Sequence, residues 1–539
     1  MQPSYDVIVV GAGSAGIPLA VRLSEDPTRR VLLLEAGPRF VGAEGFPPAL
    51  RYAGVLSAMM PDHPNNWDMV ATLREGVVQP LPRGKVVGGS SALNGALFTR
   101  GLPEDFDGWA EAGNPEWSYE RVLPFFRKLE TDQDFHDANH GADGPIPVRR
   151  ASAREQLPLD HAFIAACRQA GHPDDRDMNA PGSIGVGLLP VNMRDGVRMN
   201  TAITYLDAVL DRPNLEVRDG AEVLRVVLEG RRVVGVEVAI GGQVSTIQAG
   251  EVVLSAGAIK SPHLLMLSGI GPADELARVG ISVRCESPLV GREFTDHCSM
   301  SIPFRVQRRK SPTPDPTRSA WTHAGLHYTA AGSSEHSDML LLQSVIPINS
   351  AVFHGLPMAA RIGMLRATFG KMSVRKVLDY ARNGWDHGIN AILQRGESRG
   401  EIRLTSADPR AKPDIFYNYL ESEADRRRLR EAFRLSAGII ASEPYRALGA
   451  DRIAPGDDVL ENDAALDRHL LQHVGTAVHM ASTCRMGPSQ ATAVVDQHLR
   501  VHGVDGLRVA DSSIMPTVVR RCPAATAVMI GERAAALTG

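Results

Sequence analysis

Short apolar runs alternate with polar connections at the start of the chain. Residues 7–10 are all β-branched, which is typical of a strand buried on both faces. Apolar residues at helical spacing follow over 17–23, and a second buried run covers 31–34. A strand, a helix and a strand within about thirty residues predict a βαβ unit with a parallel sheet.

The remaining pattern divides the chain into helical and strand-rich stretches. Residues 105–129 are expected to be helical, and the Asp-, His-, Gly- and Pro-rich residues 132–149 to form a loop or a domain crossing. Residues 215–254 have the pattern of successive strands, the last of which meets a second strand–glycine–helix junction at Gly257. A further buried strand is expected over 507–510.

Residues 305–400 carry no strong motif, and a substrate-specific domain is expected there. Within this region, 339–369 is the least polar long stretch, although prolines, a glycine and arginines interrupt it. It fits either a surface that meets a membrane or a partner, or a buried loop-and-helix segment, and the second arrangement is the more common. After Ser398, β-type patterning is expected to resume.

Composition and charge narrow the class of protein. A chain of 539 residues has room for roughly two to four domains, and 43% hydrophobic with 22% charged residues is ordinary for a soluble globular protein. Lys plus Arg number 58 against 62 Asp plus Glu, a formal net charge of −4. This balance indicates neither a nucleic-acid partner nor attraction to an anionic membrane.

The cysteines and the lack of long apolar runs predict a reduced, cytoplasmic protein. The five cysteines are scattered, with no CxxC pair and no metal-ligand spacing, so neither disulfides nor a metal site is expected. The first residues lead into a strand without a signal-peptide pattern. No apolar run approaches the length of about twenty residues that a transmembrane helix needs.

A glycine loop, Gly11-Ala12-Gly13-Ser14-Ala15-Gly16, separates the first strand from the first helix. In such a loop the first glycine permits a tight turn, the second lets the backbone approach a pyrophosphate, and the third lets helix and strand pack closely. The helix N-terminus then offers N–H groups to the phosphate. Glu35 ends the second strand, where a carboxylate binds an adenosine ribose and disfavours a 2′-phosphate. The pattern predicts a dinucleotide site.

A second loop rich in glycine and serine runs from Arg83 to Gly95. Its backbone N–H groups suit a cofactor that extends beyond the first site, but a flexible surface turn has the same composition. The residues alone leave both interpretations open.

Two long segments, 84–98 and 257–271, carry a family resemblance. The first fits a signature of the glucose–methanol–choline (GMC) family of flavin oxidoreductases at every position, and the second matches another signature of that family. Further similar segments are 290–297, 398–402 and 496–516. The resemblance covers nearly the whole chain and is weakest between about 305 and 395.

The resemblance implies an α/β fold. A Rossmann-like FAD-binding domain is assembled from discontinuous segments, beside an α+β substrate domain with an antiparallel sheet. The expected boundaries are 1–155 for the first FAD-binding part with its crossing loop, 156–304 for the second part with substrate-domain contributions, 305–470 for the substrate-binding domain, and 471–539 for the third FAD-binding part with the catalytic segment.

The resemblance also implies FAD as the cofactor. Leu93 stands where some members carry a histidine bonded covalently to the flavin, so non-covalent FAD is expected. Val223 falls at the family's adenine contact, and Asp511 and Ser512 at the ribityl–pyrophosphate contact. The full set of expected cofactor-binding residues is Gly11, Gly13, Ser14, Ala15, Gly16, Glu35, Ala36, Arg83, Val87, Gly88, Gly89, Ser91, Asn94, Gly95, Ala96, Val223, Ala256, Asp511, Ser512, Pro523 and Ala524.

Alcohol oxidation requires a base for the hydroxyl proton while a hydride leaves the carbon, and histidine is the usual choice. Residues 479–487 resemble the family segment His-x-x-Gly-Thr-Cys-x-Met-Gly, with Ser482 in place of the glycine. The histidine of that segment is the family's catalytic base, so the resemblance implies this role for His479.

Cys522 occupies the position where the family usually has Asn or a second His that holds the substrate oxygen. Three roles stay open for its thiol: a pocket-lining residue, which is the most common role, a weak partner of the substrate oxygen, or a redox-active group. The last role needs a depressed pKa, for which the adjacent Arg520 and Arg521 are candidate causes. These arginines fit either an acidic substrate or partner, or a solvated or loop-anchoring role, which is more common.

The sequence therefore predicts an FAD-dependent alcohol dehydrogenase or oxidase that passes electrons to a quinone-like acceptor or oxygen. The altered position at Cys522 slightly favours a dehydrogenase. One alternative keeps the fold but performs non-oxidative chemistry, as a lyase or a light-driven decarboxylase. Another is a non-catalytic flavin-binding or interaction module. Neither the substrate nor the oligomeric state is predicted.

Overall fold

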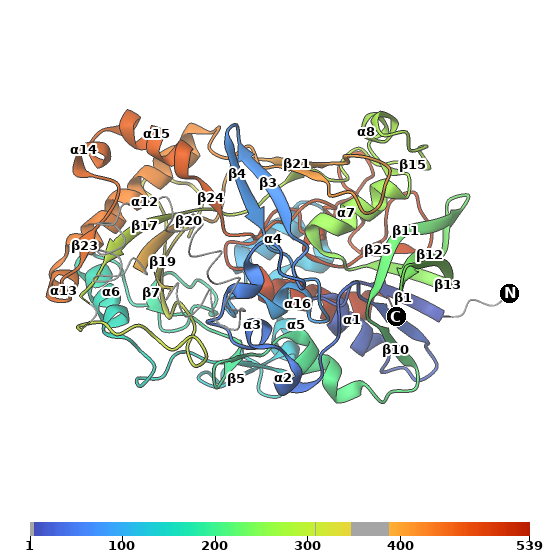
Figure 1. Cartoon of the computed structure of the whole chain (residues 1–539), viewed down its shortest axis with the longest axis horizontal. Coiled ribbons are helices and arrows are strands. Elements are labelled where there is room, and N and C mark those ends of the chain that lie inside the picture. Colours follow the sequence, from blue (N-terminus) through green and yellow to red (C-terminus); the bar gives the residue numbers. More distant parts are fainter. Residues whose placement is uncertain (1–4, 308, 347–386, 539) are drawn as a thin grey trace.

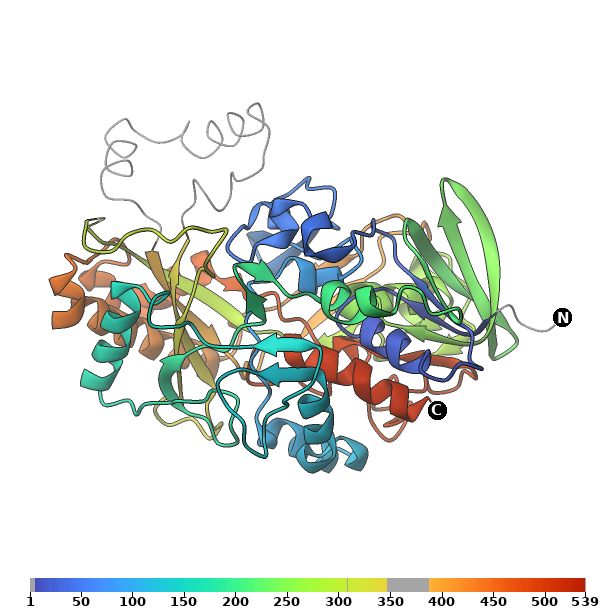
Figure 2. The ribbon, with the colours of Figure 1, turned by 90° about the horizontal axis from the view of Figure 1, so that it is seen from below.

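The computed structural model describes residues 5–307, 309–346 and 387–538. Two large sheets lie towards opposite ends of an elongated molecule, with helices packed beside each of them (Figure 1 and Figure 2). Both termini lie at the end that holds the first sheet.

The first sheet has the strand order β10-β2-β1-β13-β12-β11, and β25 pairs with β13. Strands β10, β2, β1, β13 and β25 are parallel, whereas β11, β12 and β13 form an antiparallel meander. The bounds are β1 Tyr5–Val10, β2 Val31–Leu34, β10 Leu215–Arg218, β11 Ala221–Glu229, β12 Arg232–Ile240, β13 Gln243–Leu254 and β25 Leu507–Val509. The parallel part thus combines strands from widely separated stretches of the chain.

Helices cover this sheet because their apolar residues face the buried strands. Helix α1 (Gly16–Leu23) follows β1, α7 (Gly257–Leu267) follows β13, and α16 (Ala524–Leu537) packs against α1. Strands β1, β2 and β13 end in register at Val10, Leu34 and Leu254, so both strand–glycine–helix junctions open at the same edge.

The second sheet is antiparallel, with the order β23-β17-β20-β19-β18-β7, and β24 pairs with β17. Its bounds are β7 Gly185–Leu188, β17 Cys298–Arg305, β18 Ala324–Tyr328, β19 Met339–Val345, β20 His387–Leu393, β23 Asp451–Arg452 and β24 Gly475–Thr476. Helix α12 (Glu423–Ala441) packs against β17, β19 and β20. The predicted fold class, an α/β FAD-type domain beside an α+β domain with an antiparallel sheet, is confirmed.

A smaller sheet lies between the two large ones (Figure 1). Its strands are β16 Arg292–Phe294, β21 Gly400–Arg403, β22 Asp414–Phe416, β3 Met69–Arg74 and β4 Val77–Leu81. The remaining α-helices of the described residues are α2 Gly42–Gly45, α3 Pro48–Arg51, α4 Pro103–Glu111, α5 Tyr119–Leu129, α6 Pro158–Gln169, α8 Ala273–Arg278, α13 Glu443–Ala447, α14 Asp457–Leu460 and α15 Asp463–His473. The remaining strands are β5 Glu130–Asp132, β6 Ile146–Val148, β8 Met193–Arg194, β9 Val197–Arg198, β14 Ile270–Gly271 and β15 Cys285–Glu286.

The early strands and helices agree with the sequence pattern, whereas two later expectations need correction. After Ser398 the β-pattern ends at β22, and α12 follows, whose many arginines obscured the helical spacing of buried residues such as Phe433 and Ile440. The apolar stretch that starts at Met339 begins as the buried strand β19 and not as a loop or helix, and its part from 347 to 369 lies outside the described residues.

The predicted domain boundaries remain a proposal. Strands β7, β17 and β24 of the antiparallel sheet come wholly or mainly from outside residues 305–470, so this sheet also combines separated stretches. None of the described helices has both the length and the hydropathy needed to cross a membrane.

Candidate active site

A cavity of about 500 Å³ is lined from both large sheets. Most of the residues expected at the cofactor line it: Gly11, Gly13, Ser14, Ala15, Glu35, Ala36, Arg83, Gly89, Asn94, Gly95, Val223, Ala256, Asp511, Ser512, Pro523 and Ala524. His479 and Cys522 line it as well. Five further residues of the expected set do not: Gly16, Val87, Gly88, Ser91 and Ala96.

The first glycine loop forms a cradle at one end of this cavity. Its turn is tightly packed, but the space in front of Gly13 is open. Gly11 has a φ of +102°, and a Cβ there would lie 2.5 Å from the carbonyl oxygen of Ser255. A Cβ on Gly16 would lie 1.9 Å from the carbonyl oxygen of Gly11, so this glycine serves close packing rather than the cavity. A Cβ on Gly13 would meet only Gly89 Cα, at 3.8 Å, so the space in front of Gly13 is free.

Two buried carboxylates fix the backbone around the cradle. Glu35 accepts hydrogen bonds from the N–H groups of Ala12 at 3.0 Å and Gly37 at 2.9 Å, and burial raises the pKa of Glu35 to about 7. Asp511 accepts from the N–H of Gly257 at 2.8 Å and from the Ser261 hydroxyl at 2.6 Å. Asp511 therefore ties the end of β25 to the start of α7.

The second glycine loop packs directly on the first. The N–H of Gly88 donates to Ala12 at 2.8 Å, and the Ser91 hydroxyl donates to the carbonyl of Gly88 at 2.6 Å. Gly88 and Ser91, which do not line the cavity, thus hold the two glycine loops together. The sequence alone did not single out the fully buried Arg198, which donates to the carbonyls of Leu50, Ala92 and Asn94 at 2.6–2.8 Å and so holds this loop in place.

At the other end, His479 is joined to a second histidine. Its Nδ1 lies 2.9 Å from Nδ1 of His297, and Nε2 of His297 lies 3.0 Å from the carbonyl oxygen of Val519. Because a carbonyl oxygen only accepts, Nε2 of His297 must carry a proton. Burial lowers the pKa of His297 to about 3, so its ring is neutral and its Nδ1 is bare.

The protonation state of His479 follows from this contact. The bare Nδ1 of His297 accepts a hydrogen bond, so Nδ1 of His479 carries the proton and Nε2 of His479 is left unprotonated. Burial lowers the pKa of His479 well below its usual value, and His297 and the charge of Arg83 lower it further. A neutral imidazole with a bare nitrogen therefore lines the cavity.

Asp296 holds the backbone of both histidines. Its Oδ1 accepts from the N–H of His297 at 2.6 Å and from the N–H of His479 at 2.7 Å, while Oδ2 accepts from the hydroxyls of Tyr417 and Thr476 at 2.9 and 3.1 Å. Burial raises the pKa of Asp296 to about 6, against the opposing charge of Arg83. Asp296 and His297 were not among the site residues expected from the sequence. The signal that could have found them is the Asp-His pair that ends the family-like segment 290–297.

Ser482 stands where the resemblance places a glycine, and its backbone explains that preference. Its φ is +74°, in the left-handed region that favours glycine. The Ser482 hydroxyl lies 2.8 Å from that of Thr295, which accepts from the N–H of Val518 at 2.9 Å. The Ser482 hydroxyl thus makes a hydrogen bond that a glycine at this position cannot make.

Comparison with known proteins agrees with this arrangement. The N-terminal and C-terminal models of the GMC oxidoreductase family match residues 5–299 and 396–531. The chain belongs to the GMC oxidoreductase family.

Relatives and solved structures cover nearly the whole chain. An uncharacterized GMC-type oxidoreductase of Rhodococcus erythropolis is 38% identical over 538 residues, covering 99% of this chain and 98% of the relative. Mitochondrial choline dehydrogenase of Homo sapiens is 37% identical over 553 residues, covering 99% and 89%. The crystal structure of pyridoxine 4-oxidase from Mesorbium loti superposes with a TM-score of 0.85 at 30% identity, covering 99% of each chain. This GMC protein is an FAD-dependent oxidoreductase that acts on CH–OH donors.

The cavity fits the FAD that GMC oxidoreductases bind. The open space before Gly13 suits a pyrophosphate, and Gly257 likewise has no heavy atom near the position of a Cβ. Pro523 and Ala524, at the start of α16, also line the cavity, so the positive end of a helix faces the ligand.

Cys522 is 7% exposed and lines the cavity among apolar residues. Burial raises the pKa of its thiol to about 11, which is opposite to the depressed pKa that a redox-active role needs. Arg520 binds Asp105 at 2.8 Å, and Arg521 donates to the carbonyl of Ser183 at 2.8 Å. Both arginines are buried and neither lines the cavity, so they anchor loops and are not solvated.

Replacement by alanine is expected to have different effects at Gly13 and at Gly16 of the cradle. Gly13→Ala is expected to leave folding intact but to weaken FAD binding about tenfold or more, because the methyl group occupies the space of the pyrophosphate. Gly16→Ala is expected to lower the unfolding temperature of the apoprotein, because its Cβ meets the backbone of Gly11. FAD titration and thermal unfolding of both apoproteins test this. Equal FAD affinity in Gly13→Ala and wild type would contradict the assignment of the cradle.

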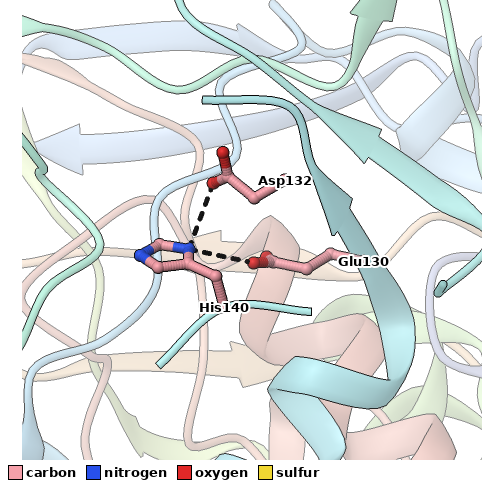
Figure 3. A group of neighbouring side chains, drawn as sticks. All are labelled: Glu130, Asp132 and His140. Atoms are coloured by element: carbon pink, nitrogen blue, oxygen red, sulfur yellow. Dashed lines mark hydrogen bonds and ion pairs between the residues drawn. The ribbon is translucent and has the colours of Figure 1, made fainter. Parts of the chain in front are cut away.

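A second cluster of ionisable residues lies in and beside the loop that follows β5. Figure 3 shows Glu130, Asp132 and His140 facing one another, and one potential metal-ligand atom of each lies within 4.8 Å of those of the other two. Nδ1 of His140 lies 3.1 Å from Asp132 and 3.3 Å from Glu130, and its Nε2 lies 2.8 Å from Asp177.

Two arginines and His140 balance the three carboxylates of this cluster. Arg100 pairs with Glu130, and Arg150 pairs with Asp132 and Asp177, so a protonated His140 balances the third carboxylate. The hydrogen bonds to Asp132, Asp177 and Glu130 outweigh the opposing effect of burial and raise the pKa of His140 to about 11. The arrangement is that of a buried ion-pair network.

This network predicts a pH-dependent stability. The pKa of His140 is higher in the folded than in the unfolded chain, so its contribution is complete below about pH 6.5 and declines as the pH rises towards 11. His140→Gln is expected to cost about 3 kcal/mol at pH 6, and less at pH 10. Thermal unfolding across this pH range measures the difference, with His161→Gln on the exposed side of α6 as the matched control. A loss that grows with pH would contradict the charge assignment.

Proposed function

We propose that this protein oxidises an alcohol to an aldehyde or ketone, with His479 as the base. The observation that carries the proposal is the chain of contacts from Val519 through His297 to His479, which leaves Nε2 of His479 unprotonated in a residue that lines the cavity. A base in this state accepts a proton without first losing one.

The proton and hydride movements follow from this geometry. Bound FAD supplies the hydride acceptor. The substrate hydroxyl donates a hydrogen bond to Nε2 of His479, and its proton moves to that nitrogen as the hydride leaves the carbon. Asp296 and His297 fix the ring during the transfer because one binds its backbone and the other its Nδ1.

The residues around the cavity are assigned to the parts of FAD. Gly11, Gly13 and Glu35 hold the adenosine and pyrophosphate end, and Asp511 with Ser512 holds the ribityl region. Leu93 lines the cavity and has no atom that forms a covalent bond to a flavin, so the cofactor is bound non-covalently.

Anaerobic mixing tests the proposal. The holoenzyme is mixed with a panel of primary and secondary alcohols, and bleaching of the visible flavin absorbance is the expected result. Reoxidation is then compared with oxygen and with a quinone-like dye, because electrons leave to one of these acceptors. If no alcohol bleaches the flavin, the proposed oxidation is wrong.

A further inference from the structure

The inner face of the antiparallel sheet forms the wall of the cavity near His479. Leu342 pairs with Asn390, and Ile392 with Ser299, so these side chains project from one face of β17, β19 and β20. All of them line the cavity. Other described residues that line this end are Leu97, Trp321, Ile346, Ala477 and Cys522. The described wall is apolar apart from the Asn390 amide, the hydroxyls of Ser299 and Thr476, the indole N–H of Trp321 and the neutral thiol of Cys522.

The ionisable groups of the cavity are distributed unevenly. Among the described lining residues, the acidic ones are Glu35, Glu222 and Asp511, which accompany the dinucleotide-binding loops and strands of the first sheet. Near His479 the lining charge is that of Arg83, whose guanidinium donates to the carbonyl of Val478 at 3.0 Å. The described lining of the reacting end therefore carries no carboxylate, and its charge is that of Arg83, while the carboxyl of Asp296 lies behind the lining, bonded to the backbone of His479.

Aromatic faces that would bind a cationic substrate are also scarce in the described wall. The ring of Trp67 has the ammonium groups of Lys85 and Lys260 at 4.7 and 4.9 Å from its centroid. Trp321 packs on Gly95, where a Cβ would lie 2.6 Å from its indole nitrogen. Quaternary ammonium ligands are bound by several aromatic faces or by a carboxylate, and the described residues that line this end offer neither arrangement.

We propose that the substrate is an uncharged alcohol with an apolar carbon skeleton, and that alcohols with a cationic group are rejected, although choline dehydrogenases are among the relatives. This inference rests on the proposed alcohol oxidation. The skeleton packs against Leu342, Ile392 and Trp321. The Ser299 hydroxyl and the Asn390 amide, whose nitrogen donates to the Ser344 hydroxyl at 3.0 Å, offer polar contacts to a second oxygen of the substrate.

A pair of isosteric alcohols tests the charge directly. Choline is compared with its carbon isostere, in which a tert-butyl group replaces trimethylammonium, alongside hexanol and benzyl alcohol. The kcat/KM for flavin reduction is expected to be roughly 100-fold higher for the best neutral alcohol than for choline, because the cation is desolvated without a partner. Choline reacting as fast as the neutral alcohols overturns the inference. If no alcohol reduces the flavin, the proposed function itself fails, and the inference fails with it.

A charge placed in the wall gives an independent test. Asn390→Asp is nearly isosteric and is expected to raise the choline-to-neutral ratio of kcat/KM about tenfold or more, because it supplies the missing carboxylate. Asn462→Asp is the matched control, since Asn462 is an exposed N-cap of α15, where Asp caps equally well. The flavin content of both variants is measured first. An unchanged ratio in Asn390→Asp overturns the assignment of this face to the substrate.

Discussion

His479→Ala is expected to slow flavin reduction by alcohol about a thousandfold, because it removes the imidazole nitrogen that accepts the hydroxyl proton. FAD binding is expected to be unchanged, since His479 is not among the residues assigned to hold the cofactor. Stopped-flow bleaching of the anaerobic holoenzyme measures the rate.

The burial that lowers the pKa of His479 also predicts that the wild-type rate persists below pH 6.5, where an exposed histidine would be protonated.

The matched control for this variant is His473→Ala. His473 is exposed at the end of α15, where its Nδ1 bonds the carbonyl of His469 at 2.8 Å. Removing it is expected to leave the bleaching rate unchanged. Equal rates for His479→Ala and wild type would show that another group takes the proton.

His297 is expected to act as a positioning residue, and a pair of substitutions isolates that role. His297→Phe removes the acceptor that keeps the proton of His479 on Nδ1, and it is expected to lower kcat about 100-fold with little change in KM. His297→Asn also loses the bond to Val519, but it offers a carbonyl oxygen near the place of Nδ1. It is expected to recover most of the rate.

Comparing the two variants separates orientation from stability. Both leave the carbonyl of Val519 without its partner, so both are expected to lose about 1–3 kcal/mol of folding stability. Only the difference in kcat reports on the acceptor. If His297→Asn is as slow as His297→Phe, the contact does not set the protonation of His479, and the assignment of its bare nitrogen fails.

Local patterns were sufficient for the dinucleotide half of the molecule. The apolar runs at 7–10 and 31–34, with glycines between them, predicted β1, α1 and β2 because each element is specified by neighbouring residues. The helical spacing in α12 was obscured by charge. The start of β19 gave no distinct signal, because a buried strand and a buried helix both appear as short apolar runs.

The sequence by itself determined the family, the cofactor and the identity of the candidate base, because these depend on motifs whose residues lie close together in the chain. Only the tertiary structure decided which nitrogen of His479 is bare, since that depends on Val519 and His297 from distant segments. It also decided that Cys522 is a neutral buried thiol, and that the described wall beside His479 is apolar. Protonation and polarity are set by burial and by neighbours in space, which no local pattern specifies.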